Sequence, residues 1–197
     1  MPSSSYVHIF RRRREGKTDY RKRKGLILGR TPFVCVHVSG KYIYSQVLKP
    51  SPQGDTTLAS ASSRDLAKKF GWKGSTKNLP GAYLTGYYLG HLAAAKNLDE
   101  VVMYSGVGRF IHGSRIASLI SGARDAGLKV KVDEESLPDE DRISGKHIAN
   151  YSQKLEKEDK SKHDRVFSRV LSSGTSPSEY PSQLESLKAK IDADSQS

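Results

Sequence analysis

The chain has 197 residues, which is enough for one well-packed domain with extensions and leaves little room for a second full domain. Its single cysteine, Cys35, excludes an intramolecular disulfide framework and a cysteine-rich zinc module. No apolar run approaches the roughly 20 residues that span a bilayer, and the N-terminus lacks the apolar stretch of a secretory signal. We therefore expect a soluble, cytoplasmic protein with no membrane partner.

The positive charge is concentrated near the N-terminus. The chain carries 33 Lys+Arg against 21 Asp+Glu, a formal net charge of +12. Residues 1–30 alone hold ten basic and two acidic side chains, whereas residues 151–197 hold eight of each. A surplus crowded into one short segment is typical of a protein that binds a polyanion.

Residues 1–30 show no sustained hydrophobic period, and four consecutive arginines repel one another on an unpartnered helix. We predict an extended or partly helical arm that becomes ordered on binding. The alternative is a solvated, disordered tail. The rings of Tyr6, His8, Phe10 and Tyr20 lie among the charges and favour binding.

From residue 33 onward the apolar residues follow a period of two. This pattern predicts strands at 33–38 and 41–48, joined by Ser39 and Gly40 in a hairpin whose register sets Val36 opposite Ile43. Residues 55–62, rich in small side chains, are predicted as a third strand. The three strands form a meander.

The second face of the hairpin carries the aromatic side chains of Phe33, His37, Tyr42 and Tyr44. Rings on a sheet can stack nucleic-acid bases. They can equally form a second buried face covered by helices. Because helices follow later in the chain, burial is the favoured interpretation.

Leu84 and Tyr88 begin a helical stripe, and Pro80 suits the first position of that helix. On a neighbouring stripe Ala82, Gly86 and Gly90 repeat every four residues. Each interior glycine costs about 1 kcal/mol relative to alanine, so we expect a close neighbour along this stripe. The sheet is the favoured neighbour, and RNA backbone is the alternative.

The remaining elements alternate between strand and helix. We predict a strand at 100–105, an amphipathic helix at 116–123 that Gly127 ends, and a strand at 128–132. This order implies parallel pairing by right-handed crossovers. The expected fold class is α/β, a mixed sheet in which a three-stranded meander is followed by α/β crossovers with packed helices.

We divide the chain into three parts. Residues 1–30 form the basic arm, 31–135 the α/β domain, and 136–197 a charged, mostly helical C-terminal extension. Residues 150–197 contain few large apolar side chains, so we expect an appendage and not a second core.

A glycine-rich turn at 106–113 lies between a predicted strand and a predicted helix. The dinucleotide-binding pattern fails at Ile111, and the lysine of a phosphate-binding loop is absent. Backbone N–H groups at the start of the helix, with Arg109, His112 and Arg115, still suit an RNA phosphate. A tight structural turn is an equally good explanation.

No catalytic, cofactor or metal site is evident. The six histidines form no metal-spaced pair, and the carboxylates of Asp139, Glu140 and Asp141 lie in a polar run that suits a solvated loop. Nothing resembles a nucleophile elbow or a triad. We expect no enzyme activity and no small-molecule substrate.

Several stretches resemble one protein family. These are RRRREGKTDYRKR at 11–23, KYIYSQV at 41–47, LASASS at 58–63, FGWKGSTKNLPGAYLTGYYLG at 70–90, IHGSRI at 111–116, ARDAGL at 123–128 and DRISGKHIANY at 141–151. Together they are similar to the archaeal and eukaryotic members of the 5S-rRNA-binding family of the large ribosomal subunit, ribosomal protein L eighteen (L five in eukaryotes). The WKGSTKN and DRISGKHI stretches favour an archaeal type.

The resemblance implies a ribonuclease-H-like arrangement found among translation components. It also implies binding to 5S rRNA and attachment of that RNA to the large rRNA in the central protuberance, beside other large-subunit proteins. The arm would run along both RNAs. One departure is that the first strand carries only His37 where many relatives carry arginine, which shifts the expected RNA contacts toward the arm.

The residues that we predict to contact RNA come from the arm, the KGSTKN segment and the glycine-rich turn. They are Arg11, Arg12, Arg13, Arg14, Lys17, Tyr20, Arg21, Lys22, Arg23, Lys24, Arg30, Lys73, Lys77, Asn78, Arg109, His112, Gly113 and Arg115.

Two alternative functions are weighed. A DNA-binding or chromatin-type protein would use the same basic arm. A metal-dependent nuclease on a ribonuclease-H-like scaffold would need carboxylates at the strand ends, for which Glu100 and Asp133 are the nearby candidates.

Overall fold

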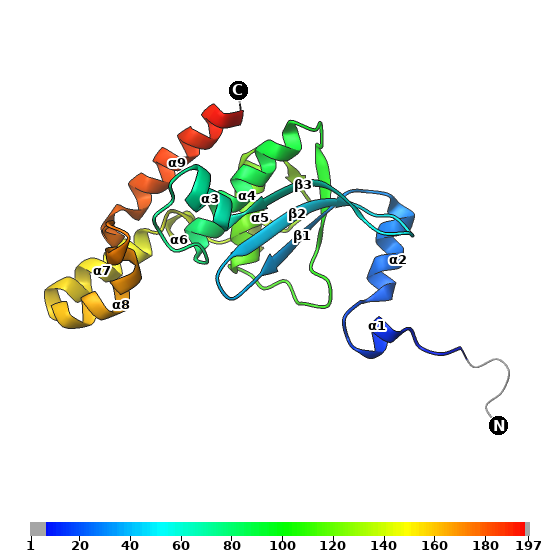
Figure 1. Cartoon of the computed structure of the whole chain (residues 1–197), viewed down its shortest axis with the longest axis horizontal. Helices are drawn as coiled ribbons and strands as arrows, with labels where there is room; N and C mark the ends of the chain where they lie inside the picture. Colours follow the sequence, from blue (N-terminus) through cyan, green and yellow to red (C-terminus); the bar gives the residue numbers. More distant parts are fainter. Residues whose placement is uncertain (1–6, 196–197) are drawn as a thin grey trace.

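A five-stranded mixed sheet forms the centre of the protein in the computed structural model, which describes residues 7–195 (Figure 1). The strands lie in the order β3-β2-β1-β4-β5. β1 to β3 form an antiparallel meander, and β1, β4 and β5 pair in parallel. Their bounds are β1 Phe33–Val38, β2 Ile43–Lys49, β3 Thr56–Ser62, β4 Glu100–Tyr104 and β5 Lys129–Val130. The predicted α/β fold with a mixed sheet is confirmed.

The β1–β2 hairpin has a longer loop than predicted. Val36 pairs with Ser45, so the predicted facing of Val36 and Ile43 is wrong by two residues. The loop is closed by Ser39, whose backbone N–H donates to the carbonyl oxygen of Tyr42 at 2.9 Å and whose hydroxyl donates to the same oxygen at 2.7 Å. A slip of two residues keeps every side chain on its predicted face, because side chains alternate with period two.

A short helix that the sequence interpretation missed follows β3 directly. α3 spans Ser63–Lys69 and begins with a capping box. The Ser62 hydroxyl accepts from the backbone N–H of Asp65, and the Asp65 carboxylate accepts from the backbone N–H of Ser62 at 3.1 Å. The serine and the acidic residue three positions later are the local signal for this start.

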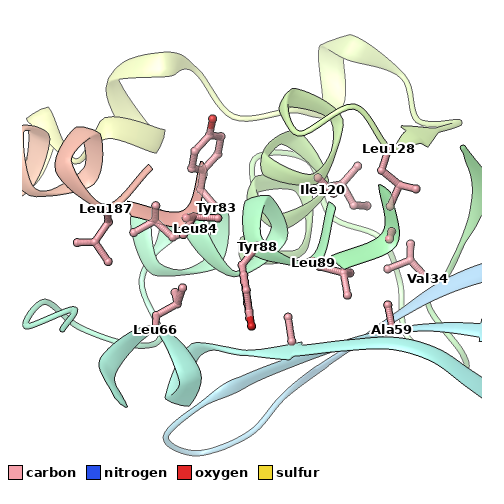
Figure 2. Packing of buried hydrophobic residues seen from close by; sticks show 14 of the residues in the cluster. Val34, Ala59, Leu66, Tyr83, Leu84, Tyr88, Leu89, Ile120, Leu128 and Leu187 are labelled. Carbon is pink, nitrogen blue, oxygen red and sulfur yellow. The ribbon is translucent and has the colours of Figure 1, made fainter. Parts of the chain in front are cut away.

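Two long helices cover one face of the sheet. α4 spans Leu79–Ala94 and α5 spans Arg115–Asp125. Figure 2 shows Leu89 of α4 and Ile120 of α5 on the side of the sheet that carries Val34 and Ala59, and all four side chains are buried in one cluster. Asn78 caps α4 and Leu79 opens it, so Pro80 is the second helical residue and not the first.

The glycine stripe of α4 faces α5, so the predicted contact with the sheet is wrong. A Cβ added to Gly86 would lie 1.8 Å from the carbonyl oxygen of Leu119. A Cβ on Gly122 of α5 would lie 2.1 Å from the carbonyl oxygen of Tyr83. The two helices approach backbone to backbone, which explains why glycine is tolerated in both helix interiors.

The opposite face of the hairpin is only partly covered in the described part of the chain. Phe33 is buried and meets Tyr104 edge-to-face at 5.4 Å between ring centroids. His37 and Tyr44 are exposed, with rings stacked at 6.4 Å and 26°. Burial was the favoured interpretation for Phe33, His37, Tyr42 and Tyr44. It is confirmed for Phe33, Tyr42 is half-buried, and it is wrong for His37 and Tyr44, because α4 and α5 both pack on the other face (Figure 1).

Helices account for most of the chain after β5. Their bounds are η1 Glu134–Ser136, α6 Glu140–Ser144, α7 Lys146–Glu158, α8 Lys160–Ser172, η2 Pro177–Glu179 and α9 Tyr180–Ser195. α7 and α8 lie side by side (Figure 1). A hydrogen bond between Ser152 Oγ of α7 and His163 Nε2 of α8, 2.9 Å long, links the two helices. Within residues 7–195, every helix is too short or too polar to cross a membrane.

The last helix packs into the main core. Tyr180, Leu184, Leu187 and Ile191 of α9 are buried and belong to the same cluster as the α4 side chains. For α9 this differs from the predicted appendage. The reason is that its few apolar residues lie on one side of the helix, so they cover α4 although the segment is polar on average. The domain boundary at residue 135 stays a prediction.

Candidate nucleic-acid interface

Two short helices carry the basic N-terminal segment. α1 spans Arg11–Arg14 and α2 spans Tyr20–Gly29, and both lie at the end of the molecule away from α7 and α8 (Figure 1). Tyr6, one of the rings predicted to take part, lies outside the described residues. Ordering of the arm on binding stays a prediction.

Glu15 offsets part of the charge of α1. Its carboxylate accepts hydrogen bonds from Lys17 Nζ and from Arg11 Nε, both at 2.8 Å. These two hydrogen bonds, that of Lys17 first, lower the pKa of Glu15 below its ordinary value, so the group is ionised at neutral pH. Arg13 and Arg14 remain exposed. The α1 turn therefore keeps a strong positive charge.

Asp19 and Tyr20 shape the start of α2. The Asp19 carboxylate caps the helix by accepting from the backbone N–H groups of Arg21 at 3.0 Å and Lys22 at 3.2 Å. The ring of Tyr20 packs on that of Phe10 with 4.9 Å between centroids. Because Phe10 packs against the Tyr20 ring, a nucleic-acid base can stack only on the part of that ring that Phe10 leaves free.

Arg23 joins the arm to the domain. Its Nη1 and Nη2 donate to the two carboxylate oxygens of Asp55, each at 2.5 Å, and Nη2 also donates to the carbonyl oxygen of Ser51 at 3.2 Å. Lys22 Nζ donates to the carbonyl oxygen of Gly106 at 3.3 Å. Arg23, predicted as an RNA contact, is thus engaged within the protein.

The other predicted cations of the arm are exposed. We call them the arm surface, and they are Arg11, Arg12, Arg13, Arg14, Lys17, Arg21, Lys22, Lys24 and Arg30. Arg30 ends α2 in the left-handed conformation, with φ of 52°. The Asp19 cap and the Arg23–Asp55 bridge fix α2, and the Phe10–Tyr20 contact links α1 to it, so these cations are presented on a defined scaffold.

The KGSTKN segment is tied to its surroundings. Lys77 Nζ donates to the carbonyl oxygen of Gly40 at 3.2 Å, in the β1–β2 loop. The side-chain Oδ1 of Asn78 accepts from the backbone N–H of Gly81 at 2.9 Å and caps α4. Of the predicted contacts in this segment, Lys77 and Asn78 have structural partners and Lys73 is exposed.

The glycine-rich turn at 106–113 has one of its backbone N–H groups paired within the protein, so fewer are free for a phosphate than its composition indicates. The backbone N–H of Gly113, where φ is +61°, donates to the carbonyl oxygen of Ser136 at 2.9 Å. Ser114 caps α5. The paired amide favours the structural explanation of the turn. The exposed side chains of Arg109, His112 and Arg115 stay as predicted RNA contacts.

The structure divides the predicted contacts into two groups. Lys22 brings the arm beside the glycine-rich turn through Gly106, whereas the KGSTKN segment lies beside α8. Lys41 and Arg169, which the sequence interpretation missed, line a groove of about 570 Å³ with Lys73 and Lys77. No local signal identifies them, because a hairpin loop and a distant helix meet only in the folded chain.

Glu100 and Asp133 do not assemble a metal centre. The Glu100 carboxylate is 2.7 Å from Lys131 Nζ, and this hydrogen bond lowers the pKa of Glu100 below its ordinary value. Within residues 7–195, no group of three or more His, Cys, Asp or Glu side chains is placed to hold a metal ion. The carboxylates that the nuclease alternative requires are not gathered there.

One family of ribosomal proteins matches about half of the chain. The family described as "Ribosomal large subunit proteins 60S L5, and 50S L18" matches residues 4–105. Large ribosomal subunit protein uL18 of Caldivirga maquilingensis is 43% identical over 189 residues, which cover 96% of this chain and 91% of the relative. The chain belongs to this family.

Further uL18 relatives agree. The protein of Sulfurisphaera tokodaii is 46% identical over 187 residues, 95% of each chain. That of Saccharolobus solfataricus is 43% identical over 181 residues, 92% of this chain and 90% of the relative. The protein is therefore a structural constituent of the large ribosomal subunit of the archaeal uL18 type and not an enzyme. The predicted family is confirmed, and the nuclease alternative is wrong.

Proposed function

We propose that this uL18 protein binds 5S rRNA and helps to attach it to the large rRNA in the central protuberance, in contact with neighbouring large-subunit proteins. The observation that carries the proposal is the arm surface. Its exposed cations lie on α1, on α2 and in the segments that adjoin them, and the Arg23–Asp55 bridge joins α2 to the domain. Cations held in a fixed arrangement lose less conformational entropy on binding a polyanion than cations on a disordered tail do.

The physical basis of this binding is counterion release. Each phosphate that a cation neutralises contributes about −0.9 to the slope of log affinity against log salt on a duplex, and somewhat less on a single strand. Arginine adds paired hydrogen bonds to phosphate oxygens and stacks on bases, so Arg12, Arg13 and Arg14 should each matter more than Lys17. Tyr20 would add a stacking or sugar contact beside them.

Selection of 5S rRNA requires more than charge. We propose that the domain supplies shape recognition through the glycine-rich turn, where Arg109, His112 and Arg115 are exposed next to the arm. Double-stranded RNA is recognised mainly by shape and by contacts to phosphates and 2′-hydroxyls. The arm surface and the glycine-rich turn, held at a fixed separation, would provide such recognition.

We also propose that the domain has the ribonuclease-H-like arrangement and occupies residues 31–135. The strand order β3-β2-β1-β4-β5, with a meander followed by parallel strands, supports the arrangement. The boundary after Arg30 is supported by the left-handed turn there, which ends α2 before β1 begins. The extension from residue 136 would then hold α6 to α8, with α9 returning to the core.

The proposal is tested by neutralising α1 in the full chain. The variant R12Q/R13Q/R14Q should bind 5S rRNA more weakly at every salt concentration, with a slope flatter by about 2 to 3. Affinity is measured by filter binding over a range of salt concentrations. Circular dichroism confirms that the domain stays folded.

The matched control is K157Q/K160Q/K162Q, which removes three exposed cations from α7 and α8. This control should leave both affinity and slope nearly unchanged. Equal losses in the two variants would mean that net charge alone acts, and no loss in the α1 variant would reject the arm as the 5S rRNA site. Duplex DNA as competitor should displace 5S rRNA poorly; comparable affinities would favour a general nucleic-acid binder.

A further inference from the structure

A second basic surface lies at the other end of the molecule from α1. It is the groove of about 570 Å³ between the β1–β2 loop, the KGSTKN segment and α8, which we call the α8 groove. Lys41, Lys73, Lys77 and Arg169 line it. Of the described residues that line it, none is Asp or Glu.

The loop that carries two of these cations is held on both sides. Toward the hairpin, Thr76 Oγ1 donates to the carbonyl oxygen of Lys41 at 2.9 Å. Toward the C-terminal helices, the backbone N–H of Ser75 donates to the Tyr180 hydroxyl at 2.9 Å. Ser173 Oγ donates to the carbonyl oxygen of Lys73 at 2.9 Å. Three segments that are distant in sequence are thereby fixed around the groove.

Close packing within the loop adds to this rigidity. The Trp72 side chain is 3% exposed, and its Nε1–H donates to the carbonyl oxygen of Ser75 at 3.1 Å. A Cβ on Gly74 would lie 2.5 Å from the Trp72 ring. The loop therefore turns tightly over the tryptophan with Lys73 exposed, so the backbone that carries Lys73 and Lys77 is held in place.

The apolar residues of the groove limit what it can bind. Phe167 and Tyr180 are 9% and 1% exposed, so they form a floor and offer no free ring for base stacking. Val166, at 50% exposure, lies on the same lining. A ligand in the groove meets several cations beside a buried apolar floor. This lining suits the phosphates of a nucleic-acid backbone better than unstacked bases, which need a free aromatic face.

We propose that the α8 groove binds the sugar–phosphate backbone of ribosomal RNA, at a segment separate from the one that the arm surface holds. Its four cations, with no Asp or Glu among the lining residues, suit a polyanion, and in a large ribosomal subunit that polyanion is rRNA. Figure 1 shows α8 and α1 at opposite ends of the protein. The inference deepens the proposed rRNA binding, because a protein with two separated RNA surfaces can bridge two RNA segments.

The test uses the full chain and two probes, 5S rRNA and deproteinised large-subunit rRNA. The variant K41Q/K73Q/R169Q removes three of the four cations of the groove and leaves Lys77 in place, because Lys77 holds the hairpin loop. With at least one of the two RNAs, the salt slope should flatten by about 2 to 3 and affinity should fall. The RNA that responds identifies the source of the backbone.

Hydroxyl-radical footprinting then separates the two surfaces. Nucleotides that lose protection in K41Q/K73Q/R169Q should differ from those that lose protection in R12Q/R13Q/R14Q. The control K157Q/K160Q/K162Q removes the same charge from outside the groove and should keep both footprints.

The inference fails if the groove variant behaves like the control with both RNAs. It also fails if the groove variant binds RNA normally but loses a protein crosslink in assembled large subunits, since a protein then occupies the groove. The proposed function fails separately, if the α1 variant keeps its 5S rRNA affinity. Thermal melting of the groove variant must match the unsubstituted chain; should it not, the single substitutions K73Q and R169Q repeat the measurement.

Discussion

Arg23 and Asp55 face each other across the junction of arm and domain, with both guanidinium Nη atoms 2.5 Å from carboxylate oxygens. The Arg23 side chain is 19% exposed and that of Asp55 is 23% exposed. A paired, fork-shaped contact of this kind fixes orientation as well as distance. The most basic part of the chain is therefore held at one place by one of its own arginines.

Substituting Asp55→Asn tests whether this bridge prepares the arm for RNA. The change raises the net charge by one and frees Arg23, so simple electrostatics predicts tighter RNA binding. Our account predicts weaker binding of 5S rRNA, by several-fold, because the arm must then be ordered on binding. Filter binding at fixed salt gives the answer. Tighter binding by the variant would show that the bridge does not contribute to RNA affinity.

The approach of α4 to α5 predicts a large stability loss for Gly86→Ala. Because the new Cβ would lie 1.8 Å from the Leu119 carbonyl oxygen, the two helices must move apart. We expect the free energy of unfolding to fall by about 3 kcal/mol or more, the upper range for an overpacked core. Urea denaturation measures it.

The control for that substitution is Gly25→Ala in α2. A Cβ there meets nothing within 4 Å. Alanine has the higher helix propensity, so this variant should be as stable as the unsubstituted chain or up to about 1 kcal/mol more stable. Similar losses for both variants would mean that tight packing does not explain the glycine stripe.

Gly74→Ala should disturb the α8 groove without unfolding the core. The added methyl group meets the buried Trp72 ring, which cannot yield easily because it donates to Ser75. We expect the loop to shift and the footprint assigned to the groove to weaken, while protections that depend on the arm persist. Tryptophan fluorescence reports the displacement of Trp72, and an unchanged emission spectrum would contradict it.

The contact between α4 and α9 predicts an alkaline transition. Burial first, and then the hydrogen bond from its hydroxyl to Asp192 at 2.7 Å, raise the pKa of Tyr87 to about 12. The neutral form is the one stabilised in the folded protein. Its contribution is present below the unfolded pKa of about 10 and is lost as the pH rises toward 12.

The variant Tyr87→Phe removes this contribution. The difference in melting temperature between the unsubstituted chain and the variant should shrink from pH 9 to pH 12, and absorbance at alkaline pH should show the missing tyrosine titration. A constant difference across that range would mean that Tyr87 does not hold α9 through its neutral hydroxyl.

The sequence predicts the sheet well because alternation and strand order are local properties. It does not determine the hairpin register, since a slip of two residues leaves Val36 on the same face and only the Ser39–Tyr42 loop decides between the alternatives. The glycine stripe predicts a close neighbour, but which element supplies it depends on how α5 packs.

For the candidate site, too, the sequence predicts local features but not the contacts that depend on folding. Charge clustering identifies Arg11 to Lys24 without a structure. Whether a cation is exposed or bound within the protein depends on partners far along the chain, as for Arg23 with Asp55 and Lys77 with Gly40. The α8 groove escapes sequence interpretation for this reason, because Lys41 and Arg169 become neighbours only after folding.

The central claim is that the arm surface contacts 5S rRNA in the ribosome. The direct measurement is photocrosslinking from position 13 in assembled large subunits, with a photoreactive residue in place of Arg13, which is exposed on α1. The account predicts a crosslink to 5S rRNA, with or without a second crosslink to the large rRNA. Crosslinks only to the large rRNA or to protein would contradict it.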